Sequence, residues 1–381
     1  MKRLELFLVS YLLISITVHG EQKDSTIVSK PEFKPTGKLW GYAFGDFSYK
    51  AHANSLGQTN TQYASQVKDF TAFEFRRIYL GYDYDISEKF ATQLLLAYEG
   101  NTLADFSRTV YIKSANIRWK NIFHNSDVVF GQMATPTFAT TSEPIWGYRS
   151  LEKTIMDFRK IGGSNDFGLS LQGKFNDEGD FGYNFMIGNG SGAKPETDKF
   201  KKFYGDFYAK FMDQKFIVDI GADNEVGQVS PYHKSKTTLK GMVAFQSSMF
   251  TIGIEAFQQI QQNSTIFTNS AAIKDTTNAV ASGISIFARG TLIKDKLMYA
   301  LRYDYYNPDT KFNKSNTYAA GYTFFNESFW MIGLDYMPYK NVHIMPNLWY
   351  DMYTNKATAQ NNLSKSSNDL VPRLTVYYIF K

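Results

Sequence analysis

The 381-residue chain contains no cysteine, which excludes disulfide bonds, thiolate metal sites and a lipid-modified N-terminal cysteine. Beyond the first twenty residues, no apolar run approaches the roughly 18 residues that a membrane-spanning helix needs. The formal net charge is only +5 and the basic residues form no runs, so nucleic acid is not an expected partner. No pair among the five histidines has the spacing of metal ligands, and neither a metal nor a cofactor is expected.

The N-terminal residues have the pattern of a secretory signal peptide. Lys2 and Arg3 precede a short apolar stretch, and Gly20 and Glu21 mark a small-residue cleavage site. A polar periplasmic lead-in is expected over 21–38. Aromatic residues make up 17% of the chain, which is unusual for a cytoplasmic enzyme and favours β structure or membrane interfaces. The sequence therefore predicts an exported protein with no helical membrane span.

The rest of the chain divides into sixteen segments of alternating polarity. Each is about ten residues long or more, the length that a tilted strand needs to cross a bilayer. Their expected bounds are 39–50, 71–85, 89–99, 108–120, 126–134, 166–176, 180–188, 201–213, 214–222, 236–247, 249–258, 280–292, 297–306, 328–338, 342–353 and 370–381.

The connections between these segments alternate in length. The short ones are 86–88, 121–125, 177–179, 212–214, 247–248, 294–296 and 339–341. The long, polar ones are 51–70, 100–107, 135–165, 189–200, 223–235, 259–279, 307–327 and 354–369. A transmembrane barrel has tight periplasmic turns and long outer loops, whereas a soluble sandwich has no reason to sort its loops in this way. The sequence predicts an all-β protein whose residues 39–381 form a sixteen-stranded antiparallel transmembrane barrel.

Strict alternation assigns side chains to lipid or to the lumen. In Phe73–Asp85 it places Arg77 in the lumen and Arg76 against lipid, a conflict that a rim position or a β-bulge at Arg76 would remove. Sixteen strands leave an aqueous channel rather than a packed interior. The main lumen-wall cations are expected at Arg77, Arg118, Lys174, Lys202, Lys210, Arg302 and Arg373. With Lys215, Lys240 and Arg289 they outnumber the acidic lumen residues Asp83, Asp206, Asp219, Glu255, Asp304, Asp335 and Asp351 by 10 − 7 = 3, which favours anions.

The longest connection, 135–165, is the candidate constriction. Leu151, Ile155 and Phe158 recur at helical spacing after Ser150, a plausible N-cap, and this pattern predicts a helix over 151–160. The charges expected to line the constriction are Glu143, Arg149, Glu152, Lys153, Asp157, Arg159 and Lys160. Arg149, Arg159 and Lys160 are the candidate anion contacts, because a charge at a narrow point acts in a lower effective dielectric.

Several short motifs resemble the phosphate-selective porin O and P family of outer-membrane channels. They are Phe75-Arg76-Arg77-Ile78-Tyr79-Leu80-Gly81, Phe130-Gly131-Gln132, Gly333-Leu334-Asp335-Tyr336-Met337-Pro338, residues 341–350 and the final Tyr377-Tyr378-Ile379-Phe380. The resemblance implies a homotrimeric, sixteen-stranded porin of the Gram-negative outer membrane. It would lie in outer-membrane lipid, be inserted by the barrel-assembly machinery and have an inward-folded third outer loop. Phosphate selectivity in that family depends on dense ladders of Arg and Lys, whereas the lumen expected here is mixed.

The function expected from these features is passive diffusion of small hydrophilic solutes, with a mild preference for phosphate or other anions. Two alternatives stay open: a solute-specific binding channel, and, more remotely, a barrel that carries an enzyme or adhesin. Ser150-Leu151-Glu152-Lys153 matches the Ser-x-x-Lys nucleophile motif, but the motifs that accompany it in penicillin-binding proteins do not follow. An enzyme is therefore not expected.

Overall fold

The computed structural model describes residues 32–56, 61–100, 103–104, 107–228, 233–318, 324–358 and 364–380. The expected signal peptide and most of the expected lead-in lie outside these residues. By its internal contacts the chain divides into residues 1–34 and a unit of residues 35–381, which holds all the described strands. Within the described ranges, no helix is both long enough and apolar enough to span a membrane.

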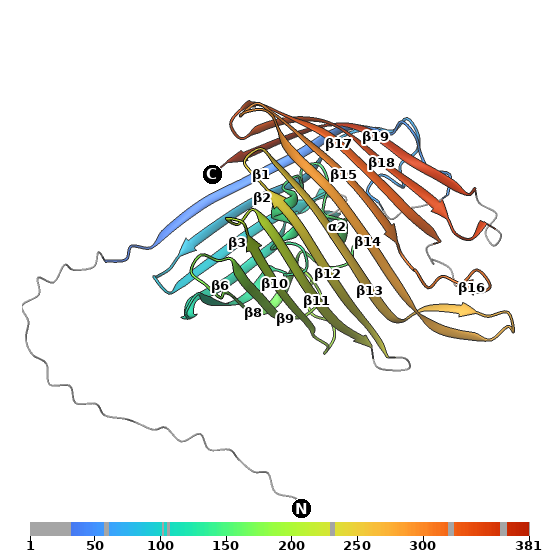
Figure 1. Ribbon diagram of the computed structural model, residues 1–381, viewed down its shortest axis with the longest axis horizontal. Coiled ribbons are helices and arrows are strands. Elements are labelled where there is room, and N and C mark those ends of the chain that lie inside the picture. Colours follow the sequence, from blue (N-terminus) through green and yellow to red (C-terminus); the bar gives the residue numbers. More distant parts are fainter. Residues whose placement is uncertain are drawn as a thin grey trace, which may run out of the picture. The chain divides into compact units, whose positions relative to one another are not determined.

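Sixteen strands form one closed antiparallel ring, which confirms the predicted fold (Figure 1). Consecutive strands of the ring pair with each other, and the last pairs with the first from Gly41 opposite Phe380 to Ser48 opposite Arg373. Closure leaves no strand edge with unpaired backbone groups, as a lipid environment requires. The strands are β1 (Thr36–Tyr49), β2 (Thr71–Asp85), β3 (Phe90–Glu99), β6 (Tyr111–Phe123), β7 (Ser126–Ala134), β8 (Asn165–Lys174), β9 (Phe181–Gly188), β10 (Lys202–Phe211), β11 (Phe216–Gln228), β12 (Lys234–Gln246), β13 (Phe250–Thr268), β14 (Lys274–Ile293), β15 (Leu297–Asn307), β17 (Phe325–Tyr339), β18 (Val342–Asn355) and β19 (Ser366–Phe380).

Strands β13 and β14 extend well beyond their predicted bounds. They have 19 and 20 residues, and their outer ends form a hairpin where the sequence predicts the loop 259–279. A hairpin that projects past the lipid needs no apolar face. Its sequence is therefore largely polar and predicts a loop rather than strands. Three short strands also lie in the long connections: β4 (Leu103–Ala104) pairs with β5 (Ser107–Arg108), and β16 (Thr317–Tyr318) pairs with β13.

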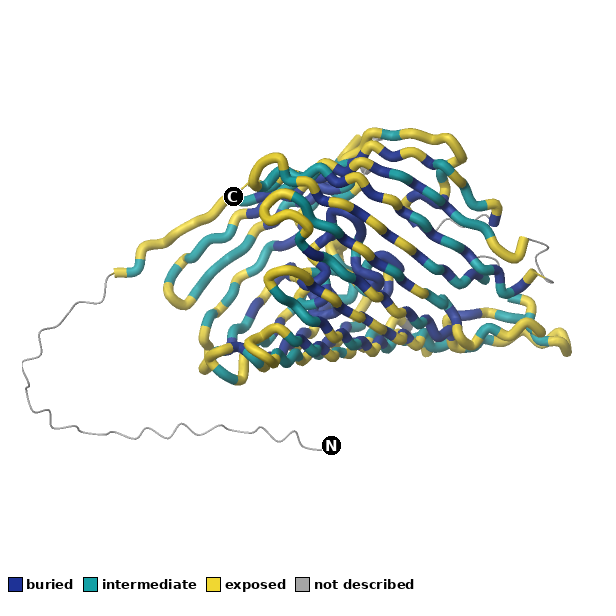
Figure 2. The backbone as a smooth tube through the Cα atoms, turned by 45° about the horizontal axis from the view of Figure 1, so that its top comes forward, coloured by how far each residue is buried: buried dark blue, intermediate teal, exposed yellow. Residues whose placement is uncertain are grey.

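Side chains alternate between a largely apolar outer face and a varied inner face. In β17, Trp330, Ile332 and Leu334 are exposed on the outside, while Phe329 and Met331, which alternate with them, are fully buried. Figure 2 shows this alternation of buried and exposed residues along many strands. The outer face matches lipid, whereas burial on the inner face depends on what covers it.

A β-bulge brings both arginines of the Arg76–Arg77 pair inside. The register of β1 against β2 shifts between Phe44 and Gly45, so that Arg76 is the extra residue of β2. Its guanidinium pairs with Asp46 on the inner face of β1. The bulge therefore removes the conflict that strict alternation creates at Arg76.

Candidate functional site

The connection between β7 and β8, residues 135–164, folds into the barrel as an inward loop. Its two ends meet, because the backbone amide of Thr135 donates to the carbonyl of Ser164 (3.0 Å) and the Thr135 hydroxyl to that of Gly163 (2.6 Å). The loop contains two short helices, α1 (Ser142–Trp146) and α2 (Ile155–Phe158).

The helix predicted over 151–160 is therefore shorter than expected. Only the middle of that range is helical, its N-cap is Thr154 rather than Ser150, and the sequence did not indicate α1. Residues 151–154 are extended or in turns, and the carbonyls of Leu151 and Lys153 accept hydrogen bonds from side chains of the barrel wall. These contacts replace the bonds that a longer helix would provide.

The inward loop packs against one side of the barrel interior, the inner faces of β13–β15 and β17–β19, here called the anchoring wall. Trp146 meets Phe287 with ring centroids 5.4 Å apart, and Phe158 meets Phe329 at 5.0 Å. Leu151 is fully buried in the same cluster. Such aromatic pairs contribute beyond the apolar area they bury, so this side of the lumen is a packed core.

Four arginines of the barrel wall fix the path of the inward loop. They donate to its carbonyl oxygens: Arg289 to Ile145 (3.1 Å), Arg76 to Ser150 and Leu151 (3.3 Å to Leu151), Arg373 to Leu151 (2.8 Å) and Arg302 to Lys153. Buried carbonyls need such donors where no secondary structure supplies them. Arg302 and Arg373, predicted to line the lumen, are consequently only 4% exposed and lie beneath the loop.

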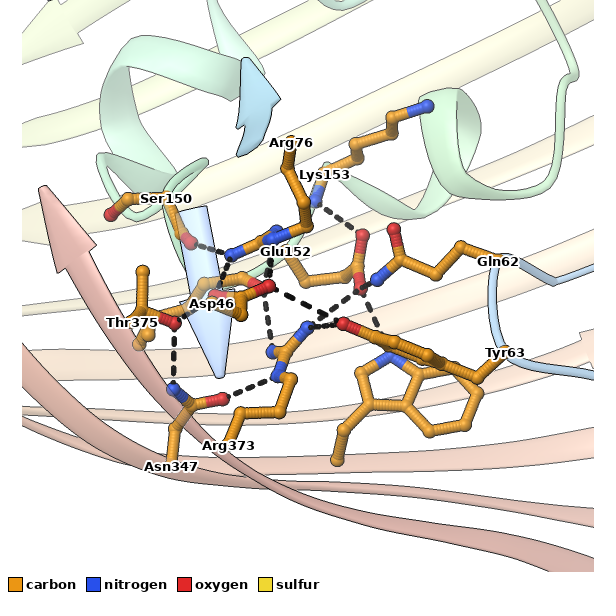
Figure 3. A network of polar contacts seen from close by, with 12 residues as sticks. Asp46, Gln62, Tyr63, Arg76, Ser150, Glu152, Lys153, Asn347, Arg373 and Thr375 are labelled. Carbon is orange, nitrogen blue, oxygen red and sulfur yellow. Dashed lines mark hydrogen bonds and ion pairs between the residues drawn. The ribbon is translucent and has the colours of Figure 1, made fainter. Parts of the chain in front are cut away.

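Glu152 belongs to the same anchoring contacts and not to the constriction predicted for it. It is 1% exposed, and its carboxylate accepts hydrogen bonds from the Trp349 indole (2.9 Å) and the Gln62 amide (3.0 Å). Arg373 lies 4.0 Å from it and also donates to the hydroxyl of Tyr63 (3.0 Å), as Figure 3 shows. Gln62 and Tyr63 belong to the first long connection, which therefore also reaches into the barrel.

Arg159 also differs from its predicted role as an anion contact. It is 9% exposed and pairs with Glu327 and with Asp351, whose carboxylate lies 3.2 Å away. Burial alone would lower the pKa of Arg159, but Asp351 and Glu327 more than offset that effect and raise it. The side chain lies between the loop and the anchoring wall because it ends α2 on the packed side, next to Phe158.

On its other side the inward loop presents a compact group of charges. Arg149 bridges Glu143 and Asp157, with 2.6 Å between a guanidinium nitrogen and the Asp157 carboxylate. Lys153 lies 3.9 Å from Asp157 and is 39% exposed at its side chain. These residues were predicted at the constriction, and their side-chain charges pair with one another.

Opposite this group lies the open wall, defined as the inner faces of β2, β3 and β6–β10. Glu99 of β3 pairs with Arg77 (3.2 Å) and with Lys113 (3.0 Å). Burial raises the pKa of Glu143 to about 7; Asp157 adds to the rise, and Arg77 and Lys113 partly offset it. Arg77 and Lys113 of the wall thus lie close enough to Glu143 of the loop to act on its charge. The group of Arg77, Glu99, Lys113, Glu143, Arg149 and Asp157 is here called the six-charge constriction.

A cavity lies on each side of the six-charge constriction. The outer cavity, towards the long connections, has a volume of about 330 Å³ and is lined by Tyr63, Arg77, Glu99, Arg149, Lys153 and Lys160, among others. The inner cavity, towards the short turns, has about 490 Å³ and is lined by Lys38, Asp83, Gln93, Arg118, Met133 and Thr140, among others. A third space of about 250 Å³ shares Arg118 and Thr140 with the inner cavity and includes Lys174. The cavities of the lumen therefore lie along the open wall.

The predicted site residues thus fall into two groups. The cavity-lining group contains Arg77, Arg118, Arg149, Lys153, Lys160 and Lys174, with Glu143 and Asp157 beside Arg149. Arg77 lies at the edge of the outer cavity and is only 3% exposed. The buried group contains Glu152, Arg159, Arg302 and Arg373. Lys202 is also buried, 3.0 Å from Asp223, and so does not line the lumen as predicted. Lys210 is partly buried, with its amine 5.4 Å from the ring centroid of Tyr208.

Sequence reasoning missed two charges of the constriction, Lys113 and Glu99. The register between β3 and β6 shifts between Leu95 and Leu96, and this irregularity brings Lys113 to the inner face. Strict alternation from Arg118 would place Lys113 against lipid. A basic residue on the predicted lipid face was therefore the sequence signal that could have indicated an irregular register here. Glu99 ends β3 and has no sequence feature that distinguishes it.

No protein-family profile and no curated protein matches the chain. Several solved structures share its fold. The outer membrane channel DcaP of Acinetobacter baumannii has a TM-score of 0.65 and 13% identity, over 92% of this chain and 99% of that one. An anion-selective porin from Comamonas acidovorans has a TM-score of 0.59 and 10% identity, over 91% and 100%. The trimer form of OmpT from Vibrio cholerae has a TM-score of 0.56 and 12% identity, over 91% and 99%.

Proposed function

We propose that this chain is an outer-membrane porin that lets small hydrophilic solutes diffuse passively and mildly prefers anions. The observation that carries the proposal is the six-charge constriction, with a cavity on either side. The inward loop fills only the part of the lumen against the anchoring wall, and the remaining space is lined by charged and polar groups that water can solvate. A sixteen-stranded barrel is wide enough to hold both a loop and an aqueous path.

The mild anion preference rests on the balance of charges that face this path. The six-charge constriction contains three cations and three carboxylates, which nearly cancel. Lys153 and Lys160 add positive charge at the outer cavity, and a Glu143 pKa of about 7 leaves part of one carboxylate protonated. The excess of positive charge along this path is small. It therefore argues for weak discrimination among anions rather than for a phosphate-specific channel.

The cellular setting is part of the same proposal. The apolar outer faces of the strands fit outer-membrane lipid, and the N-terminal pattern fits export with cleavage near Gly20, followed by insertion through the barrel-assembly machinery. We propose a homotrimer, which is supported by the trimer form of one structural neighbour. Mass spectrometry of the outer-membrane fraction tests the cleavage site, and cross-linking of the unheated protein tests the trimer.

The channel itself is tested by reconstituting the purified protein in planar lipid bilayers. Stepwise conductance in potassium chloride, with a reversal potential slightly on the anion side in a salt gradient, is the expected result. Current that grows linearly with salt indicates diffusion, whereas saturation by one solute indicates the alternative, a binding channel. Phosphate is included as a competing anion. A folded barrel that conducts no ions would refute the proposal.

A further inference from the structure

Beside the constriction, the barrel wall carries a row of tyrosines. Tyr42 of β1 pairs in register with Tyr79 of β2, Tyr79 with Ala97 of β3, and Ala97 with Tyr111 of β6. Side chains at paired positions lie on the same face and touch. Tyr42 and Tyr111 pack on the buried cluster around Tyr79 and Ala97 while staying partly exposed themselves. Tyr42, Tyr79 and Tyr111, here called the tyrosine row, thus form an aromatic surface on the inner wall.

The tyrosine row differs from the other aromatic clusters inside the barrel. Phe287, Phe329 and Trp349 are at most 4% exposed, because the apolar side chains of the inward loop cover them. The space in front of Tyr42 instead holds charges, since Glu143 of the loop lies within electrostatic range of its hydroxyl. The packing of the loop therefore does not account for an aromatic surface at this level.

Cations flank the same surface. The guanidinium of Arg77 lies 5.0 Å and the Lys113 amine 5.6 Å from the ring centroid of Tyr79. Glu99 of the same wall pairs with both cations and accepts a hydrogen bond from the Tyr79 hydroxyl (2.6 Å). On the described part of the wall beside the tyrosine row, one carboxylate thus pairs with two cations.

Two guanidinium donors at this level are also unsatisfied. Among the described residues, the Nε groups of Arg77 and Arg149 are buried and have no hydrogen-bond partner. Buried donors of this kind are rare because each costs free energy until an acceptor arrives. A carboxylate is a matched acceptor for guanidinium groups. The guanidinium groups of Arg77 and Arg149 therefore keep hydrogen-bonding capacity that the protein does not use.

We propose that the tyrosine row and these cations form a binding station for planar aromatic carboxylates. The aromatic ring of the solute stacks on Tyr42 and Tyr111, while its carboxylate meets Arg77 and Lys113 from the wall and Arg149 from the loop. Offset stacking between rings and charge-assisted hydrogen bonds are separately favourable, and a solute with both groups uses both. The inference rests on the proposed channel and names the solute class that this constriction retains longest.

The test measures block of the chloride current through the reconstituted channel by four probes. Benzoate is the planar aromatic anion, cyclohexanecarboxylate has its size and charge without a planar ring, acetate has the charge alone, and benzylammonium has the ring with the opposite charge. Benzoate is expected to block at a concentration about three- to tenfold lower than cyclohexanecarboxylate, and lower still than acetate. Benzylammonium is not expected to block.

Variants locate the station. Replacing both exposed rings (Tyr42→Leu with Tyr111→Leu) should remove the advantage of benzoate over cyclohexanecarboxylate. The matched control is Tyr208→Leu, a partly buried tyrosine of β10 that lines the third space away from the row; it should keep that advantage. If the double variant does not assemble, Tyr111→Leu alone should reduce the advantage.

Two results would refute the proposed binding station without refuting the proposed channel function. Equal block by benzoate and cyclohexanecarboxylate in a conducting wild-type channel would show that ring planarity has no effect. Loss of the benzoate advantage in Tyr208→Leu but not in the double variant would place binding elsewhere. Absence of any conductance from folded protein would instead refute the proposed porin function.

Discussion

The anchoring wall and the open wall of this barrel carry the same kinds of side chain, but the chain uses them differently. On the anchoring wall, Arg302 and Arg373 are buried and donate hydrogen bonds to carbonyl oxygens of the inward loop. On the open wall, Arg118 lines the inner cavity and its side chain is 38% exposed. The difference teaches that a charge on the inner face of a barrel strand is not necessarily a charge of the pore, because a loop can cover it.

The comparison also explains the apolar residues on the inner face. Phe329 and Met331 face inwards from β17 and are fully buried, because the inward loop packs on them. The open wall instead carries Lys113 and Glu99, which pair with each other. One barrel interior therefore combines a protein-like core with an aqueous surface, and the inward loop is the boundary between them.

Removing the inward loop should have the largest effect on conduction through the channel. Replacing residues 138–161 by a short Gly-Ser linker is feasible because the ends of the loop already meet at Thr135 and Ser164. Single-channel conductance should rise about twofold or more, since the loop occupies lumen that a sixteen-stranded barrel leaves open. Cutting back the tip of the β13–β14 hairpin, 264–277, is the control and should leave conductance unchanged. Unchanged conductance in a folded loop deletion would place the loop outside the pore.

Arg159→Gln tests the anchoring wall. It leaves Glu327 and Asp351 buried without their cation, and loss of one partner of such a buried pair costs about 3–5 kcal/mol. The loop should loosen, which appears as increased current noise and earlier proteolysis of the loop, while the reversal potential changes little. The control, Lys160→Gln at an exposed position, should change stability by no more than about 0.5 kcal/mol. A strong shift of the reversal potential in Arg159→Gln would show that Arg159 faces the pore after all.

Arg149→Gln tests the six-charge constriction. It removes the cation between Glu143 and Asp157, so the reversal potential should move towards cations, with about a twofold change in permeability ratio. Lys174→Gln is the matched control, because Lys174 is exposed near a short turn, where salt screens its charge. Equal shifts in both variants would argue against a localised constriction.

The smallest expected effect is a dependence on pH set by Glu143. Its pKa of about 7 lies above the value of an exposed glutamate, so the group gains a proton as the pH falls from 8 to 6. Arg149 then loses a counter-charge, and the anion preference should increase. In Glu143→Gln the preference should be constant over this range, whereas an unaltered pH dependence would assign it to another group.

The same shift has a consequence for stability. Between the unfolded pKa of about 4.3 and the folded value of about 7, the folded state binds more protons than the unfolded state. This group therefore makes the protein less stable as the pH rises through that window. Denaturant titrations of the wild type and Glu143→Gln at pH 5 and pH 8 measure how much this group changes the free energy of unfolding.

The barrel could be predicted from the sequence alone. Segment length, polarity with a period of two and the alternation of short and long connections follow from crossing a bilayer with paired strands, and each can be read without knowing any contact. The same reasoning identified 135–165 as the loop to examine and predicted Glu143, Arg149 and Asp157 at the constriction, with Arg77 on the facing wall. A rim position or a bulge at Arg76 could also be expected, because alternation would place this charge in lipid.

Only the tertiary structure decided which inner-face charges meet open space. Arg149 and Arg159 are both arginines of one loop, ten residues apart, yet one faces the constriction and the other is buried against Glu327 and Asp351. Lys113 reaches the constriction through an irregularity in strand pairing. Polarity patterns tell inside from outside, because lipid and water differ. They cannot tell a covered inner wall from an open one, because a buried ion pair and a solvated charge use the same residues.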